Sequence, residues 1–345
     1  MLNNTRRIKT LRTMPLTALL MALLPALLPV LPMAFTASAR AQSPASAEAP
    51  AASAWKFFQD GPHRLAYQCL GSGSPTVILE PPGGLPAEVV YRKLLPGLAQ
   101  SHKTCFYERL GFGRSDMAPA GLTQTIVQHR AQLQALIERE AAGEKILLAG
   151  FSLGAQSARV YAAAHPERVA GLLLIDPIHE DWADELKQRM HADDWAKMQG
   201  IFDWLKNRAA YLFAESQADV RAATLPQNMP VRVISRGMPF YRVGLIGMSD
   251  DGVKLFNGVH DRLQLDLLKL TARTTRVVAT RSDHTVADSE PELVLAEFAL
   301  LLKDLLAAAS DGAVPSDSLA AHRSHTNPEA ETRSTPTART PPARQ

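Results

Sequence analysis

Ser152 stands in a short segment whose residue types suit nucleophilic chemistry. Residues 150–154 read Gly-Phe-Ser-Leu-Gly and follow an apolar run at 146–148. A serine between two glycines, at a sharp turn from a strand into a helix, is the pattern of a nucleophile elbow. The glycines leave room for a strained backbone and for close approach of the following helix. Such a serine attacks a carbonyl carbon when a base removes its proton.

The elements that would position this serine alternate along the chain. Apolar or alternating runs typical of strands precede or follow segments with helical periodicity. This alternation predicts an α/β fold, with a mostly parallel central sheet and helices on both faces. The expected strands are 63–70, 76–79, 104–107, 146–148, 169–175, 231–235 and 276–280, and the expected helices are 89–100, 125–142, 156–164 and 292–306.

Three segments outside the elbow resemble the α/β-hydrolase superfamily. Residues 105–116, CFYERLGFGRSD, resemble its Tyr-Asp-Arg-x-Gly-x-Gly-x-Ser-Asp block. Residues 64–84 resemble its opening hairpin and oxyanion loop, and 282–284 with 291–292 resemble its terminal histidine segment. The resemblance covers most of residues 63–305. It implies an α/β-hydrolase fold with a helical cap insertion, in a secreted branch of serine hydrolases.

The chain departs from the superfamily pattern at two places. Glu108 stands where Asp is usual, and we expect it to be structural and paired with a nearby cation. Pro81 and Pro82 stand where relatives usually carry His-Gly or a small residue and Gly. Glu80, just upstream, is also expected to be structural rather than in contact with substrate.

His284 is the candidate base for Ser152. It follows the last expected strand, at the sheet edge where ligands collect in open α/β folds, and it matches the superfamily's histidine. His179 and His260 are the alternatives. The histidines expected to face solvent from helices or helix ends are His129, His165 and His191.

Asp176 is the favoured acid partner of the histidine. It ends the apolar strand 169–175, which places it at the same sheet edge as Ser152 and His284. The superfamily's order is serine, acid, histidine, and its acid more often follows the next strand. No carboxylate occupies the turn after 231–235 here, so Asp250 and Asp251 are the alternatives.

An oxyanion hole needs two N–H donors aimed at the developing negative charge. The backbone N–H of Leu153 would supply one. Proline has no N–H, so Gly83 is the first residue after Pro81 and Pro82 that supplies the other, with Gly84 as the alternative.

The chain also contains an insertion and two cysteines that bear on the site. Residues 178–229 are rich in tryptophan and show helical periodicity, which predicts a cap or lid over the site. Cys69 and Cys105 lie on strands expected to be neighbours. They either form a disulfide or remain two buried thiols, since cross-strand disulfide geometry is demanding. No cysteine or histidine spacing suggests a metal site.

The two ends of the chain have compositions unlike that of a folded domain. A basic start, an apolar run at 14–35 and Ala-x-Ala at 39–41 predict a signal peptide over 1–41, cleaved before Gln42. An uncleaved membrane anchor is the alternative, although three prolines interrupt the run. We expect a linker at 42–54, the hydrolase domain at 55–308 with its cap at about 178–229, and a disordered tail at 309–345.

Removal of the leader changes the charge balance. Residues 1–41 hold five of the 37 basic residues and no acidic residue, so the formal charge falls from +3 to −2. A basic patch for nucleic acid is therefore not expected. A stable membrane span is not expected once the leader has been cleaved. The protein is expected in the periplasm or secreted.

These features predict a serine hydrolase that cleaves a small, fairly apolar ester, thioester, lactone or amide through an acyl-enzyme. The expected partner is a small acyl substrate, and no metal or organic cofactor is required. The alternatives are a cofactor-free C–C hydrolase, an acyltransferase, or an inactive hydrolase-like binding protein. The resemblance disfavours haloalkane dehalogenation, because that branch uses Asp where Ser152 stands.

Overall fold

The computed structural model of the protein describes residues 54–311. The predicted signal peptide, nearly all of the linker and most of the tail lie outside these residues. Within them, eight strands form one sheet in the order β1-β2-β4-β3-β5-β6-β7-β8. The first three strands in this order pair antiparallel, and all later pairs are parallel. The strands are β1 (Lys56–Asp60), β2 (His63–Leu70), β3 (Val77–Glu80), β4 (Thr104–Tyr107), β5 (Ile146–Phe151), β6 (Val169–Ile175), β7 (Val231–Arg236) and β8 (Thr274–Ala279).

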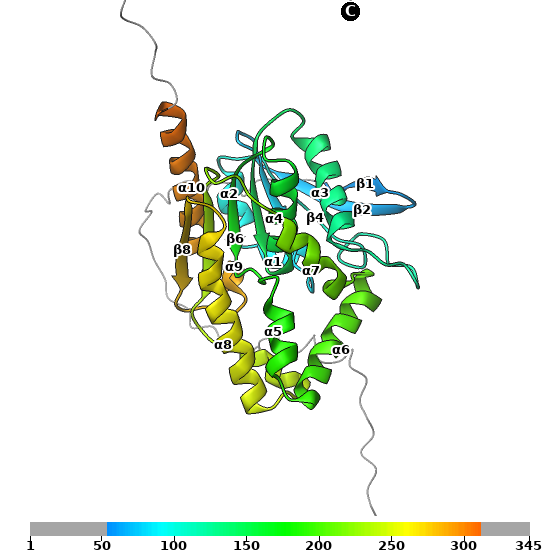
Figure 1. Cartoon of the computed structure of the whole chain (residues 1–345). Helices are drawn as coiled ribbons and strands as arrows, with labels where there is room; N and C mark the ends of the chain where they lie inside the picture. The colour runs from blue at the N-terminus through cyan, green and yellow to red at the C-terminus, as the bar shows by residue number, and fades with distance from the viewer. Residues whose placement is uncertain (1–53, 312–345) are drawn as a thin grey trace, which may run out of the picture. The chain divides into compact units, whose positions relative to one another are not determined.

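Helices cover both faces of the sheet, as predicted (Figure 1). Alternate residues of a strand point to opposite faces of the sheet, so each buried strand contributes side chains to two hydrophobic cores, one on each face. Ile78, Leu148 and Leu174 pack under α3 (Ile126–Glu140) and α4 (Leu153–Ala164). Leu79 and Leu173 pack on the other face. The helices of that face are α1 (Ala87–Tyr91), α2 (Leu95–Ala99), α9 (Val286–Ser289) and α10 (Pro291–Asp311).

The cap is built from two parts of the chain, one on each side of β7. Three helices lie between β6 and β7, inside the predicted interval: α5 (Trp182–Arg189), α6 (Ala192–Ala209) and α7 (Phe213–Ala222). After β7 come a 3₁₀ turn, η2 (Tyr241–Ile246), and α8 (Asp250–Asp266), which was not predicted. Figure 1 shows α5, α6 and the lower part of α8 extending together beyond the end of the sheet. One buried cluster joins them, including Trp182, Met198, Phe213, Met248 and Phe256.

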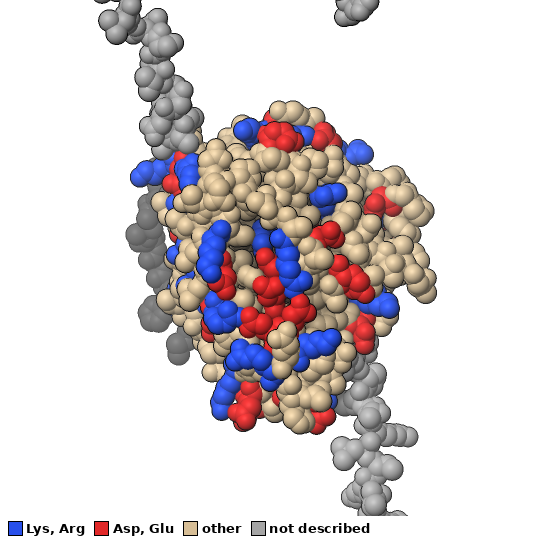
Figure 2. Space-filling view, in the orientation of Figure 1, with Lys and Arg blue, Asp and Glu red and all other residues tan. Residues whose placement is uncertain are grey.

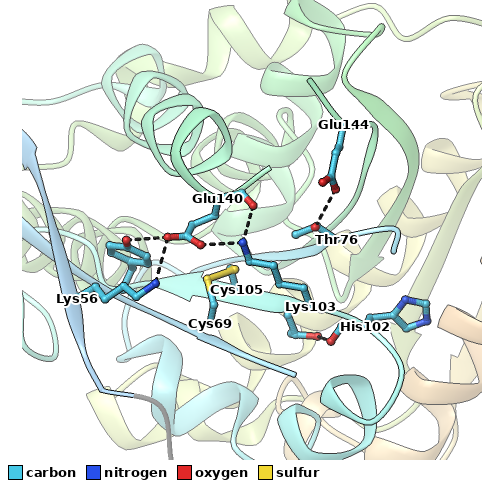
Figure 3. Close-up of a disulfide and its surroundings, with 10 residues drawn as sticks. Lys56, Cys69, Thr76, His102, Lys103, Cys105, Glu140 and Glu144 are labelled. Atoms are coloured by element: carbon cyan, nitrogen blue, oxygen red, sulfur yellow. Dashed lines mark hydrogen bonds and ion pairs between the residues drawn. A yellow bond between two sulfur atoms is a disulfide. The ribbon is translucent and has the colours of Figure 1, made fainter. Parts of the chain in front are cut away.

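Cys69 and Cys105 form a disulfide between β2 and β4 (Figure 3). The two residues are direct partners in the antiparallel register, with a Cα–Cα distance of 4.1 Å. The carboxylate of Glu140, at the end of α3, lies beside the disulfide. It accepts a hydrogen bond from the Tyr67 hydroxyl and forms an ion pair with Lys103 at 2.8 Å. The structure thus contains the disulfide, which is one of the two states that the sequence left open.

Three further elements differ from the sequence expectation. β1 was not predicted, because its sequence KFFQD buries only Phe58. The single helix expected at 89–100 is two short helices, and Pro96 lies in the first turn of the second, where a residue that cannot donate an intrahelical hydrogen bond is tolerated. α10 continues to Asp311, past the expected domain end at 308.

Charged side chains of both signs are interspersed on the face shown in Figure 2. Arg221 pairs with Asp181 at 2.7 Å and with Asp184, and Arg262 pairs with Glu185. None of the helices within residues 54–311 combines the length and apolar character that crossing a bilayer requires.

Candidate active site

Ser152 occupies a strained turn between β5 and α4. Its φ is +58°, a backbone conformation that residues other than glycine rarely adopt. A Cβ on Gly150 would lie 2.4 Å from the carbonyl oxygen of Gly154, and a Cβ on Gly154 would lie 2.5 Å from that of Pro81. Both glycines are therefore required for the close packing of strand, helix and loop around the serine.

His284 lies between Ser152 and Asp176 on the loop from β8 to α9. Its Nε2 is 3.0 Å from Ser152 Oγ, and its Nδ1 is 2.5 Å from Asp176 Oδ2. The imidazole packs against the rings of Phe151 and Phe240, with centroids at 4.7 and 5.3 Å. The structure thus brings the predicted serine, base and acid into one hydrogen-bonded chain.

Asp176 follows β6 directly and is fully buried. Its φ is +37°, and its Oδ1 accepts hydrogen bonds from the backbone N–H of Arg236 and from Nε2 of His260, both at 3.0 Å. Burial acts to raise the pKa of this carboxyl, but the interactions with His260 and His284 outweigh it and hold the pKa well below its ordinary value. Asp176 is therefore ionised at neutral pH.

The alternative acids lie elsewhere. Asp250 and Asp251 are exposed in the first turn of α8, and Asp251 pairs with Lys254. Asp261, further along α8, is largely exposed, and its Oδ1 lies 3.7 Å from Nη2 of Arg236. Among the described carboxylates, only Asp176 accepts a hydrogen bond from the candidate base.

His260 is part of the site in a role that sequence reasoning missed. It was an alternative base, but it donates to Asp176 instead of contacting Ser152. Burial lowers the pKa of His260, which favours the neutral ring. No local motif marks this residue, because its position depends on α8 packing over the carboxyl end of β6. His179, the other alternative base, accepts the backbone N–H of Asp181 at the start of the cap.

The two residues predicted to supply the oxyanion donors, Leu153 and Gly83, lie next to each other. Leu153 is the first residue of α4, where backbone N–H groups have no intrahelical acceptor. A Cβ on Gly83 would lie 2.9 Å from the Leu153 side chain, so the loop after β3 touches the elbow. Within residues 54–311 neither N–H donates a backbone hydrogen bond. Both remain available for an anion at the serine.

A buried polar network holds the loop that carries Gly83. Arg109 Nη2 donates to Glu80 Oε1 at 2.6 Å and to the carbonyl oxygen of Pro81 at 2.8 Å. Burial raises the pKa of Glu80 to about 7, although Arg109 opposes the shift. His129 contacts Arg109 and is buried, so the expectation that it faces solvent is wrong. Glu80 has the structural role expected of it.

Glu108 pairs with no cation among residues 54–311, and that expectation is also wrong. Its carboxylate accepts the backbone N–H groups of Ala87 and Glu88, at 2.8 and 3.0 Å, and so caps the start of α1. Burial raises its pKa to about 7. A Cβ on Gly113, which has φ +51°, would lie 2.5 Å from this side chain. The glycine of the 105–116 segment therefore makes room for the Glu108 carboxylate at the start of α1.

An apolar cavity of about 170 Å³ lies beside His284, between the sheet and the cap. His260 and Arg236 border it on the side of Asp176. Its remaining wall comes mainly from cap elements and consists of Ile178, Trp182, Met198, Ile201, Phe202, Leu205, Phe213, Phe240 and Phe256.

The ligand-type side chains that lie close together within residues 54–311 do not form a metal site. The group consists of Cys69, Cys105 and Glu140. Both sulfurs are in the disulfide, and a metal requires cysteine as the thiolate.

Comparison with known proteins identifies the family. The family description "alpha/beta hydrolase fold" matches residues 81–274, more than half of the chain. The chain belongs to this family. The fold predicted from the sequence is therefore confirmed.

Individual relatives are distant. A haloalkane dehalogenase of Sphingobium indicum is 29% identical over 133 residues, which cover 37% of this chain and 44% of that protein. The uncharacterized protein YqjL of Bacillus subtilis is 23% identical over 247 residues, covering 71% of this chain and 88% of that protein. The structure of mouse alpha/beta hydrolase domain-containing protein 10 superposes with a TM-score of 0.52 at 16% identity, covering 74% of this chain and all of the other.

Proposed function

We propose that this protein is a serine hydrolase that cleaves a small, fairly apolar ester, thioester, lactone or amide. The observation that carries the proposal is the continuous chain from Ser152 Oγ through His284 to the buried carboxylate of Asp176, at a strained strand-to-helix turn. A serine, a histidine and an oriented acid in this geometry perform acyl transfer on unrelated folds.

In the first half of the reaction, Ser152 Oγ attacks the substrate carbonyl carbon while His284 Nε2 takes its proton. Asp176 holds the imidazole through Nδ1 and stabilises the cation that forms. The negative charge on the carbonyl oxygen is met by the N–H groups of Leu153 and Gly83, and each such donor contributes about 10²–10³ in kcat. The bond to the leaving group then breaks, and His284 gives its proton to that group.

In the second half, water attacks the acyl-enzyme. His284 takes a proton from the water, and the bond between the acyl carbon and Ser152 Oγ breaks as the serine recovers its proton. The net reaction adds one water to the substrate and releases a carboxylic acid and the alcohol, thiol or amine. Every proton transfer uses His284 Nε2, so no further group is needed.

The cavity beside His284 supports a small apolar substrate. Its volume of about 170 Å³ is below the 300–1,000 Å³ of sites for drug-sized ligands. An acyl group buried there is shielded from bulk water by Trp182, Phe213 and Phe256. Shielding of this kind strengthens the electrostatic interactions at the reacting atoms.

A fluorophosphonate probe tests the proposal, because it labels an activated serine irrespective of the natural substrate. We expect the unmutated protein to be labelled, Ser152→Ala to be unlabelled, and His284→Ala and Asp176→Asn to be labelled far more slowly. Asp250→Asn is the matched control, since its carboxylate is exposed on the cap, and it should be labelled at the normal rate. Failure to label the unmutated protein would sink the proposal. A panel of esters, thioesters, lactones and amides then separates the bond types.

We also propose that the protein is exported, to the periplasm or beyond. The features in favour are the predicted signal peptide over 1–41 and the pairing of Cys69 with Cys105, since disulfides persist mainly in oxidising compartments. Sequencing of the mature N-terminus after expression tests this, with Gln42 expected as the first residue. A mature protein that retains residues 1–41 contradicts it.

A further inference from the structure

Two hollows, one between the sheet and the cap and one on the cap, share lining residues. The apolar cavity of about 170 Å³ lies beside His284, and a groove of about 580 Å³ runs along the cap between α5, α6 and α7. The residues that line both are Phe202, on α6, and Phe213, at the start of α7. These two side chains separate the cavity from the groove.

The wall between the hollows is one pair of rings thick. Phe202 and Phe213 stack with centroids 4.6 Å apart and planes 7° apart. On the groove side, Trp195 packs edge-on against Phe202 at 6.0 Å, and on the cavity side Trp182 packs edge-on against Phe213 at 6.3 Å. Trp195 lines only the groove and Trp182 only the cavity. The stacked pair of Phe202 and Phe213 therefore forms the partition between the cavity and the groove, and the two tryptophans lie outside it, one on each side.

The cavity volume limits what fits in front of this partition. An apolar cavity of about 150 Å³ accepts a molecule the size of benzene. The cavity beside His284 is slightly larger, so it holds a group of about six carbon atoms. A longer chain extending from the serine would reach the stacked rings, and the continuation of its path lies in the groove behind them.

We propose that Phe202 and Phe213 set the upper size limit of the acyl group, and that the groove behind them is the route by which a longer chain would continue. This inference rests on the proposed function, because it assigns a chain-length limit to the acyl group that Ser152 receives. It identifies Phe202 as a specificity-determining residue. Phe202 is only partly buried, so its truncation perturbs the packing of the cap less than truncation of the buried Phe213.

Hydrolysis of 4-nitrophenyl esters with acyl chains of about two to twelve carbons tests the inference, because only the chain changes along the series. For the unmutated protein we expect kcat/KM to fall sharply beyond about six carbons. For Phe202→Ala we expect the ratio of kcat/KM for the decanoyl ester to that for the acetyl ester to rise at least about tenfold, with Phe202→Leu in between. Trp195→Ala is the matched control, because it removes a ring from the groove side alone, and its chain-length profile should match that of the unmutated protein.

The possible results separate the inference from the function on which it rests. If the unmutated protein cleaves short esters, and Phe202→Ala and Phe202→Leu leave the profile unchanged, the partition does not set the limit and the inference is overturned, while the proposed function stands. The same holds if Trp195→Ala shifts the profile as much as Phe202→Ala. If the unmutated protein neither reacts with the fluorophosphonate nor cleaves any ester of the series, the proposed function fails.

Discussion

Removal of the disulfide between Cys69 and Cys105 should cost a large part of the protein's stability. The two residues are 36 positions apart in the sequence. The loop-closure entropy that a cross-link of this span removes from the unfolded chain corresponds to about 4 kcal/mol at 25 °C. The free energy of unfolding of a domain is typically about 5–15 kcal/mol. The variant Cys69→Ala/Cys105→Ala should therefore fold but unfold at a clearly lower urea concentration.

Urea unfolding followed by circular dichroism measures this effect in three samples: the oxidised protein, the protein with a thiol reductant, and the double variant. We expect the oxidised protein to be more stable than the double variant by about 2–4 kcal/mol. The reductant should destabilise the unmutated protein under unfolding conditions and leave the double variant unchanged. Equal stability of all three samples would refute the reasoning.

Three further predictions concern the site and the loops beside it. Asp176→Asn should lower kcat for a cleaved ester by about 10⁴, because the amide no longer fixes the tautomer of the base; steady-state kinetics measure this, and a loss below tenfold contradicts the assigned acid. Gly154→Ala should destabilise the protein by about 1–3 kcal/mol, because its Cβ would lie 2.5 Å from the carbonyl oxygen of Pro81; an unchanged thermal melting temperature would show that the loop yields. The raised pKa of Glu108, about 7 in the folded protein, means that the folded state binds this proton more tightly than the unfolded state. The resulting stability is complete below about pH 4.5 and is lost as pH rises to about 7. Chemical denaturation from pH 5 to 8 should therefore show a shallower decline in Glu108→Gln than in the unmutated protein, and equal slopes count against the shift.

The fold and the reacting chain were predictable because they depend on local pattern and on strand order. The elbow at Ser152 is a contiguous motif, and His284 and Asp176 each follow a recognisable apolar strand. The carboxyl ends of parallel strands meet at one edge of a sheet, so three residues far apart in sequence were expected together. The absence of a carboxylate after β7 directed the choice of acid to Asp176 at the end of β6, and in the structure this residue contacts His284.

The remaining parts of the site depend on tertiary packing that no local pattern reveals. His260 lies on α8 and contacts Asp176 across 84 positions in the sequence, a contact that only the folded chain brings about. The role of Glu108 also escaped prediction, because its partners are backbone N–H groups, which every sequence contains. His129 was expected at the surface because its helix was recognised without its partner Arg109.

The position of Asp176 directly after β6 has a consequence for how this protein can diverge. The loop that follows β7 carries none of the three residues of the hydrogen-bonded chain, and its residue Phe240 borders the cavity. Arg236, at the end of that strand, donates its backbone N–H to Oδ1 of Asp176 at 3.0 Å, and its buried guanidinium lies 3.5 Å from Oδ2. Substitution of Phe240 can therefore reshape the cavity while Ser152, Asp176 and His284 stay unchanged.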